Sequence, residues 1–120
     1  MIFTENKEDL SKDEKISKEE KRLKRIFKNL DKNKRDTVQP LIKTAAFLAV
    51  SLDELQEIIN SEGYTVEYQN GANQKGTKQS DAVKTHIAMT KNYSTVVKQL
   101  LELVPAEQRK ESKLEMMRRE

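Results

Sequence analysis

The chain has 120 residues, of which 36% are charged and 35% apolar, and its formal net charge is +3. This length suits one domain, and so low an apolar content is typical of a helical protein that completes its core by oligomerising. The absence of cysteine excludes disulfides, thiolate zinc sites and cysteine nucleophiles. Because no apolar run approaches the ~18 residues of a membrane span, we expect a cytoplasmic protein without a membrane partner.

Both ends of the chain are rich in Lys, Glu, Asp and Ser. We therefore expect residues 1–16 to form a flexible N-terminal arm and residues 105–120 a flexible C-terminal tail. The tail contains Leu114, Met116 and Met117, which suit a short amphipathic segment on a partner protein, although a disordered tail is the simpler interpretation. Residues 17–104 remain as the folded helical domain.

The first helix is predicted to start at Ser17, which forms a capping box with Glu20. Its apolar residues are spaced three and four apart, as expected for one face of a helix: Leu23, Ile26, Phe27 and Leu30. The helix should end within residues 31–36, where the apolar residues stop.

Basic residues dominate this first helix, with nine Lys or Arg against three acids in residues 18–35. Five of them recur at four-three-four-three spacing and would line one helical face, and Arg22, Lys24 and Lys34 widen this stripe. The candidate DNA contacts are Lys21, Arg22, Arg25, Lys28, Lys32 and Arg35. Solubility alone does not require such an excess of one sign, and DNA contact and plain solvation are equally good explanations.

A second helix is predicted from a cap at Asp36 or Thr37, with Pro40 in its first turn, where the missing amide proton costs little. Its broad apolar face must be covered from more than one side. Ser51 starts a second capping-box pattern inside this run, so a kink at Ser51 and one continuous helix remain equally open. Gly63 is the expected stop.

A short β-hairpin is predicted next. Residues 64–69 alternate aromatic or β-branched with polar side chains, Asn70-Gly71 suits a turn, and a return strand is expected around residues 76–79. Because an isolated two-stranded hairpin is marginal in water, we expect Tyr64 and Tyr68 to pack on a helix or on a neighbouring subunit.

The last helix should run from Ser80-Asp81 to just before Pro105, a length of roughly 37 Å at 1.5 Å per residue. Two adjacent heptad rows give it a face wide enough to contact a helix of its own chain and one of another chain. The fold class is therefore mainly α, with long antiparallel helices and one hairpin insertion, oligomerising through the helices. The expected contacts between subunits are Tyr64, Tyr68, Met89, Tyr93, Val96 and Leu100.

No pattern in the chain indicates catalysis, a metal or a cofactor. The lone histidine, His86, lies in the apolar seam and is better explained as a packed side chain. The pairs Glu19-Glu20 and Asp53-Glu54 are adjacent in sequence and suit helix capping rather than acid and base roles. A binding protein, not an enzyme, is expected.

Three segments together resemble the small terminase subunits of tailed phages. They are LAVSLDEL at residues 48–55, GYTVEYQNG at residues 63–71 and KNYSTVVKQLLELVP at residues 91–105. They occur in the family's order, and the resemblance covers about residues 20–104. It implies a viral DNA-packaging factor in the cytoplasm of an infected bacterial host. Proteins of this family form rings, bind viral double-stranded DNA, and recruit and regulate the large subunit, which carries the ATPase and nuclease.

The family has no catalytic motif to transfer to this chain, so the DNA contacts above rest on charge pattern alone. An adaptor or structural oligomer without DNA contact is the alternative. A transcription regulator is less suitable, because no helix-turn-helix is evident and a recognition helix starting near Ser51 would be acidic.

Overall fold

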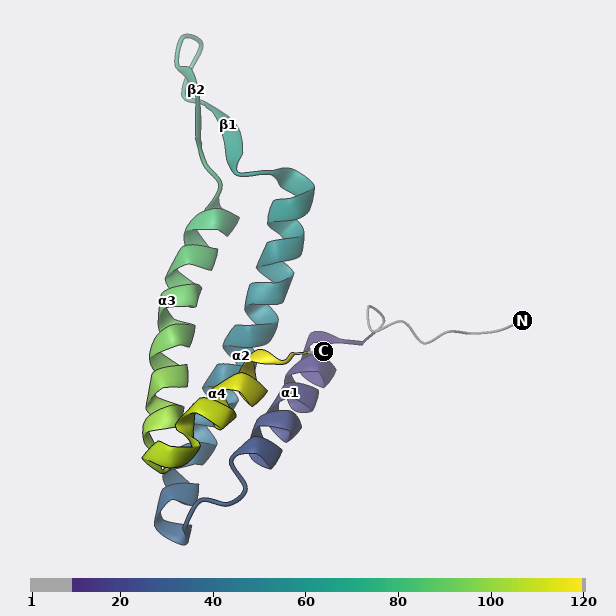
Figure 1. Cartoon of the computed structure of the whole chain (residues 1–120). Helices are drawn as coiled ribbons and strands as arrows, with labels where there is room; N and C mark the ends of the chain where they lie inside the picture. Colours follow the sequence, from purple (N-terminus) through teal and green to yellow (C-terminus); the bar gives the residue numbers. More distant parts are fainter. Residues whose placement is uncertain (1–9, 120) are drawn as a thin grey trace, which may run out of the picture.

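The computed structural model describes residues 10–119, and within them the chain is mainly helical with one antiparallel hairpin, as predicted. The elements in chain order are α1 (Lys12–Ile26), α2 (Lys32–Glu62), β1 (Thr65–Gln69), β2 (Lys75–Gln79), α3 (Asp81–Glu102), the 3₁₀ turn η2 (Ala106–Gln108) and α4 (Arg109–Met117). The long helices α2 and α3 run side by side, and the hairpin joins them at one end (Figure 1). No helix of this described part has both the length and the apolarity to cross a membrane.

The first helix begins earlier and ends earlier than predicted. Ser11, not Ser17, is its N-cap, and the Ser11 Oγ accepts a hydrogen bond of 3.2 Å from the Glu14 backbone N–H. The helix ends at Ile26, and a turn follows in which Phe27 and Leu30 are 3% and 6% exposed. These two side chains are therefore core residues of the connection and not a continuation of the helical face.

The second helix begins at Lys32 because the Asp31 carboxylate accepts a hydrogen bond of 3.1 Å from the Lys34 backbone N–H. The predicted cap at Asp36 or Thr37 is wrong, and Pro40 lies inside the helix instead of in its first turn. The helix continues through residue 51 to Glu62, so the second capping pattern does not end it.

Gly63 ends α2, as predicted. Its φ of 84° and ψ of −170° lie in a region that is open essentially to glycine alone, and its N–H still bonds the Ile59 carbonyl at 2.8 Å. The chain therefore turns sharply from the helix into β1.

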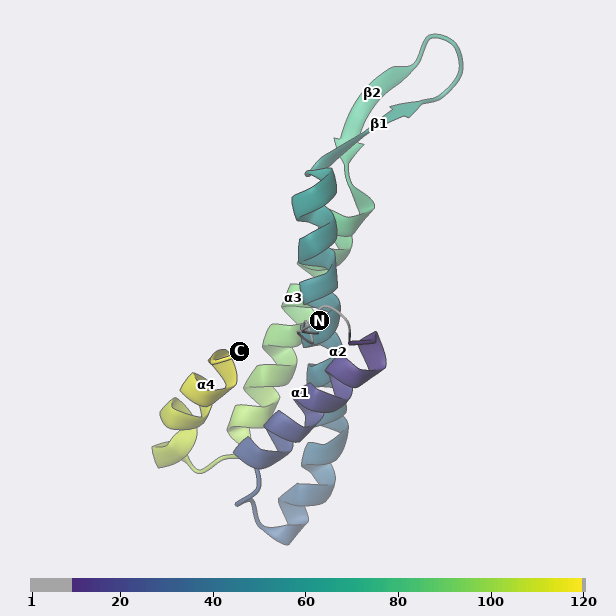
Figure 2. The ribbon, with the colours of Figure 1, turned by 90° about the vertical axis from the view of Figure 1, so that its right-hand side faces the viewer.

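The hairpin extends beyond the ends of the helices (Figures 1 and 2). Tyr68 lies opposite Gly76 in the register, and its ring covers that glycine so closely that an added Cβ would be 2.8 Å from the Tyr68 Oη. Tyr64 is 73% exposed and Tyr68 41%. The expectation that the tyrosines pack on a helix of the same chain is thus wrong, whereas packing on a neighbouring subunit stays a prediction.

The third helix forms as predicted, since Ser80 caps it by accepting a hydrogen bond of 3.1 Å from the Val83 N–H, and it ends before Pro105. The core lies at the end of the α2–α3 pair away from the hairpin, where α1 and α4 pack on it (Figure 2). Its most completely buried large side chains are Leu23, Ile42, Leu100 and Met116.

The C-terminal segment was expected to be a flexible tail, and the structure corrects this. Residues 106–117 form η2 and α4, and Met116 is 1% exposed within the core. A single buried methionine, together with hydrogen bonds described below, anchors a helix whose other apolar residues, Leu114 and Met117, are exposed. At the other end, residues 1–9 of the predicted arm lie outside the described residues, and residues 12–16 belong to α1.

Two adjacent methionines test the docking of α4. Met116→Ala should lower the free energy of unfolding by about 2–5 kcal/mol, because it leaves a cavity in the core. Met117→Ala is the matched control, since Met117 is 69% exposed, and it should change that free energy by less than about 0.5 kcal/mol. Urea unfolding followed by circular dichroism measures both, and equal effects would show that α4 does not dock through Met116.

Ser51 is the second test of the fold. Its Oγ is buried inside α2 and has no hydrogen-bond partner in the described part of the chain. Ser51→Ala should therefore raise the free energy of unfolding by about 1 kcal/mol. The control Ser61→Ala, at an exposed position of the same helix, should gain only the difference in helix propensity, about 0.5 kcal/mol. A loss of stability in the Ser51 variant would mean that the hydroxyl has a partner.

Candidate nucleic-acid interface

The basic stripe predicted along one helical face does not form. Its four-three-four-three spacing requires an unbroken helix, whereas α1 ends at Ile26. Lys28 lies in the connection, and Lys32 and Arg35 belong to the first turn of α2. Lys21 and Arg25 keep their spacing of four on α1, and Lys32 and Arg35 keep their spacing of three on α2, but the two pairs lie on different helices.

The basic side chains gather instead at one end of the molecule, around the α1–α2 connection, opposite the hairpin (Figure 1). We call this the basic end and define it by six exposed residues: Lys21, Lys24, Arg25, Lys28, Lys32 and Arg35. Asp31 is the one acid between residues 21 and 35, and it is engaged as the cap of α2. The Arg35 Nε donates to the Leu30 carbonyl at 3.0 Å, which helps to fix the connection, and Arg35 as a whole remains exposed.

Arg22 has a different role from the one predicted. Its guanidinium binds both oxygens of the Glu19 carboxylate, at 2.6 and 3.0 Å. It also donates to the backbone carbonyls of Glu115 and Met116, each at 2.9 Å, at the C-terminal end of α4. Its assignment as a DNA contact is therefore wrong, because its charge is neutralised and its donors are used within the chain.

Glu19 is the centre of an ion network that joins both ends of the chain. It is 7% exposed, and besides Arg22 it accepts a hydrogen bond of 3.1 Å from the Arg119 Nε. Arg119 in turn binds Asp53 on α2 at 2.8 Å. Burial alone would lower the pKa of Arg119, but the hydrogen bond and charge of Asp53, with the charge of Glu19, outweigh it and raise that pKa. The network therefore holds the C-terminus against α1 and α2.

Only part of this network was recognisable in the sequence. Glu19 and Arg22 are three residues apart, a spacing at which helical side chains meet. Arg119 lies 100 residues from Glu19 in the chain, so no local pattern could have paired them.

The predicted contacts between subunits divide into three groups by their exposure. Val96 and Leu100 are 9% and 0% exposed and belong to the core of their own chain, so their assignment to a subunit interface is wrong. Met89 and Tyr93 are half-buried against the same core, and burial is the main cause that raises the pKa of Tyr93. Of the six, the two hairpin tyrosines, Tyr64 and Tyr68, remain exposed.

The contribution of Glu19 to stability can be tested by comparing a Glu19 variant with a variant of its neighbour, Glu20. Glu19→Gln should lower the free energy of unfolding by about 2–3 kcal/mol, because two partly buried arginines lose their shared counter-charge. Glu20→Gln removes the same charge from a side chain that makes no hydrogen bond or ion pair within residues 10–119, and it should be nearly neutral. Chemical denaturation of both variants gives the comparison, and indistinguishable midpoints would rule out a structural role for the network.

Comparisons with protein families, with curated proteins and with solved structures give no match to this chain. A functional interpretation therefore depends on the resemblance in its sequence and on the arrangement of its own side chains.

Proposed function

We propose that this chain is a DNA-packaging subunit of the small-terminase kind, active in the cytoplasm of an infected bacterial host. Several copies assemble into a ring, the basic end binds viral double-stranded DNA, and the assembly recruits and regulates the large terminase subunit. The sequence resemblance over residues 48–105 supports this proposal, and it spans the end of α2, the hairpin and α3.

The observation that carries the proposed DNA contact is the concentration of exposed cations at the basic end. Within residues 21–35, six exposed Lys or Arg accompany one acid, although the whole chain carries a net charge of only +3. Phosphate backbones attract such clusters without regard to sequence, and each neutralised phosphate releases counterions. A ring would present several basic ends at once, so that weak contacts add.

The residues proposed to touch DNA are Lys21, Arg25, Lys28, Lys32 and Arg35, all exposed. Lys24 joins them because it is exposed on the last turn of α1. Arg22 is left out, since it binds Glu19 and α4.

A second candidate function is an oligomeric adaptor that contacts only proteins. It is favoured by large apolar side chains that are exposed away from the basic end. Tyr64 and Ile87 are 73% and 57% exposed, and Leu114 and Met117 on α4 are 50% and 69% exposed. Under this alternative the basic end is solvated or binds an acidic protein.

DNA titration of a charge-reversed variant separates the two functions. Arg25→Glu combined with Lys28→Glu should weaken binding to double-stranded DNA at least about tenfold. It should also flatten the log-log salt dependence by about 1.8, since each lost phosphate contact removes about 0.9. Fluorescence anisotropy across a salt series measures both quantities.

The matched control is Lys110→Glu combined with Lys113→Glu, which makes the same change in net charge at exposed positions of α4. It should leave most of the affinity intact. An equal loss in both variants would mean that net charge alone, and not the basic end, attracts DNA. If the unaltered protein does not bind DNA even at low salt, the adaptor function is the correct one.

A further inference from the structure

Half of the α2–α3 pair has no helix packed on it. The helices α1 and α4 lie against the other half, and the ion pair of 2.9 Å between Lys12 and Glu54 marks where the cover by α1 begins (Figure 2). We call residues 54–91 the arm; it comprises the end of α2, the hairpin and the start of α3. In the arm only Ile59 and Ser80 are buried. A third layer is therefore missing along these two helices.

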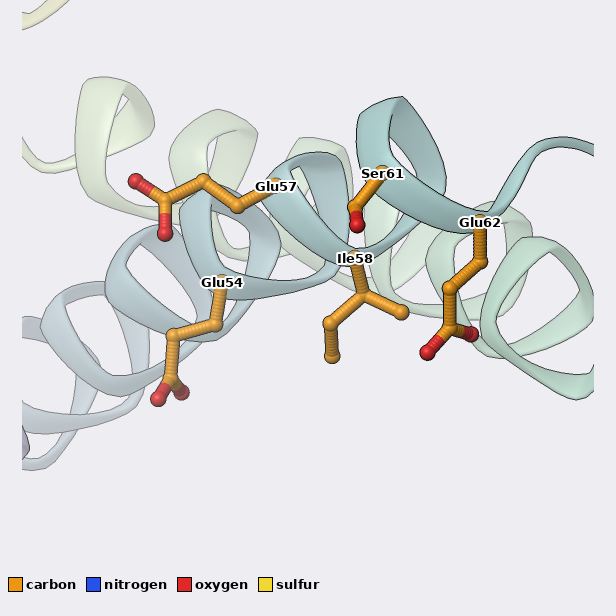
Figure 3. A pocket seen from close by; sticks show the side chains of 5 residues that line it. All are labelled: Glu54, Glu57, Ile58, Ser61 and Glu62. Carbon is orange, nitrogen blue, oxygen red and sulfur yellow. The ribbon is translucent and has the colours of Figure 1, made fainter.

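The α2 side of the arm is acidic. Glu54, Ile58 and Glu62 extend from the same side of the helix, with Glu57 and Ser61 beside them (Figure 3). Ile58 is 41% exposed in the middle of these carboxylates. We call these five residues the glutamate face. Between residues 52 and 62 the sequence contains four acids and no basic residue.

The α3 side of the arm has the opposite charge and a similar layout. Lys84, Ile87 and Lys91 follow one another at spacings of three and four, and Lys98 comes seven residues later, so all four lie on one side of the helix. All are exposed, and Ile87 is 57% exposed between its lysines. We call these four residues the lysine face. Within residues 10–119 no ion pair involves these lysines, Glu57 or Glu62.

We propose that the glutamate face of one copy packs against the lysine face of the next copy, with Ile58 and Ile87 at the centre. This inference rests on the self-assembly in the proposed function and names the surfaces that carry it. Each face has an isoleucine enclosed by charges of one sign, so the two faces complement each other in polarity and in charge. The contact supplies the layer that the arm lacks and removes both exposed isoleucines from water.

Charge also restricts the symmetry of the contact. Two glutamate faces repel each other, and so do two lysine faces, which disfavours contacts between like faces. We propose that each copy uses one face toward each neighbour, which makes the contact head-to-tail. Repetition of such a contact generates a ring when the rotation closes.

The test is a charge exchange between two variants. The first is Glu57→Lys with Glu62→Lys, so that both faces of that chain are basic. The second is Lys84→Glu with Lys91→Glu, so that both faces are acidic. Glu54 is left unchanged because it pairs with Lys12. Each variant alone should need at least about tenfold higher concentration to assemble than the unaltered protein, because like charges face each other.

An equimolar mixture of the two variants should assemble again, since every contact then joins a basic face to an acidic one. Native mass spectrometry should find oligomers that contain both variants in equal numbers. Circular dichroism should show unchanged helix content in each variant, because all four altered positions are exposed. Both variants leave the basic end unaltered, so their DNA binding can be measured separately from their assembly.

Different outcomes would contradict the proposed contact between the faces and the proposed ring. If each variant assembles like the unaltered protein, or if the mixture does not recover assembly, the pairing of these faces is wrong although self-assembly stands. If the unaltered protein is a monomer at every concentration, the ring in the proposed function fails as well.

Discussion

Two antiparallel helices cannot bury their apolar faces on each other alone, and this constraint organises the whole structure. The pair formed by α2 and α3 needs additional layers, which α1 and α4 supply from opposite ends of the chain. Leu23 and Met116, at 0% and 1% exposure, are the side chains through which these layers enter the core. Glu19 then binds Arg22 and Arg119, so that a charged network closes over the apolar contact. Where these layers end, the pair becomes an arm with almost no buried side chains.

The parts of the fold that were predictable from the sequence are those that local chemistry fixes. Gly63 has a backbone conformation that essentially only glycine adopts, so it was a reliable end for α2. Ser80 is a polar cap directly before a helical pattern, and the alternation of residues 64–69 is that of a strand. The hairpin and α3 followed from these signals. The acidic and basic sides of the arm were also present in the sequence, but only the structure showed which half of each helix is uncovered.

The parts of the fold that were not predictable depend on competition between alternative helix caps or on contacts between residues far apart in the chain. Ser11 and Ser17 both offer capping patterns, as do Asp31 and Asp36, and the sequence contains no measure of which one tertiary packing selects. The choice of Asp31 places Phe27 in a turn and so breaks the basic stripe. The role of Arg22 depends on carbonyls more than 90 residues away in the chain, and a lone buried methionine in α4 has no periodic signal. The basic pattern therefore indicated a region of the chain whose cations are mostly exposed, but it also included Arg22, whose donors are used within the chain.

The network around Glu19 also bears on the order in which the chain folds during synthesis. Its contacts between α1 and the C-terminal segment join residues 93 to 100 positions apart, so α1 leaves the ribosome long before its partners in that segment exist. Until then the groove that receives Met116 is open, and the Glu19 carboxylate has only Arg22 beside it. The entropic cost of closing so long a loop is large, but this cost depends only weakly on the exact length of the loop. Until α4 emerges, a nascent chain consequently exposes the apolar surface that Met116 covers, and this interval is when it is most vulnerable to aggregation.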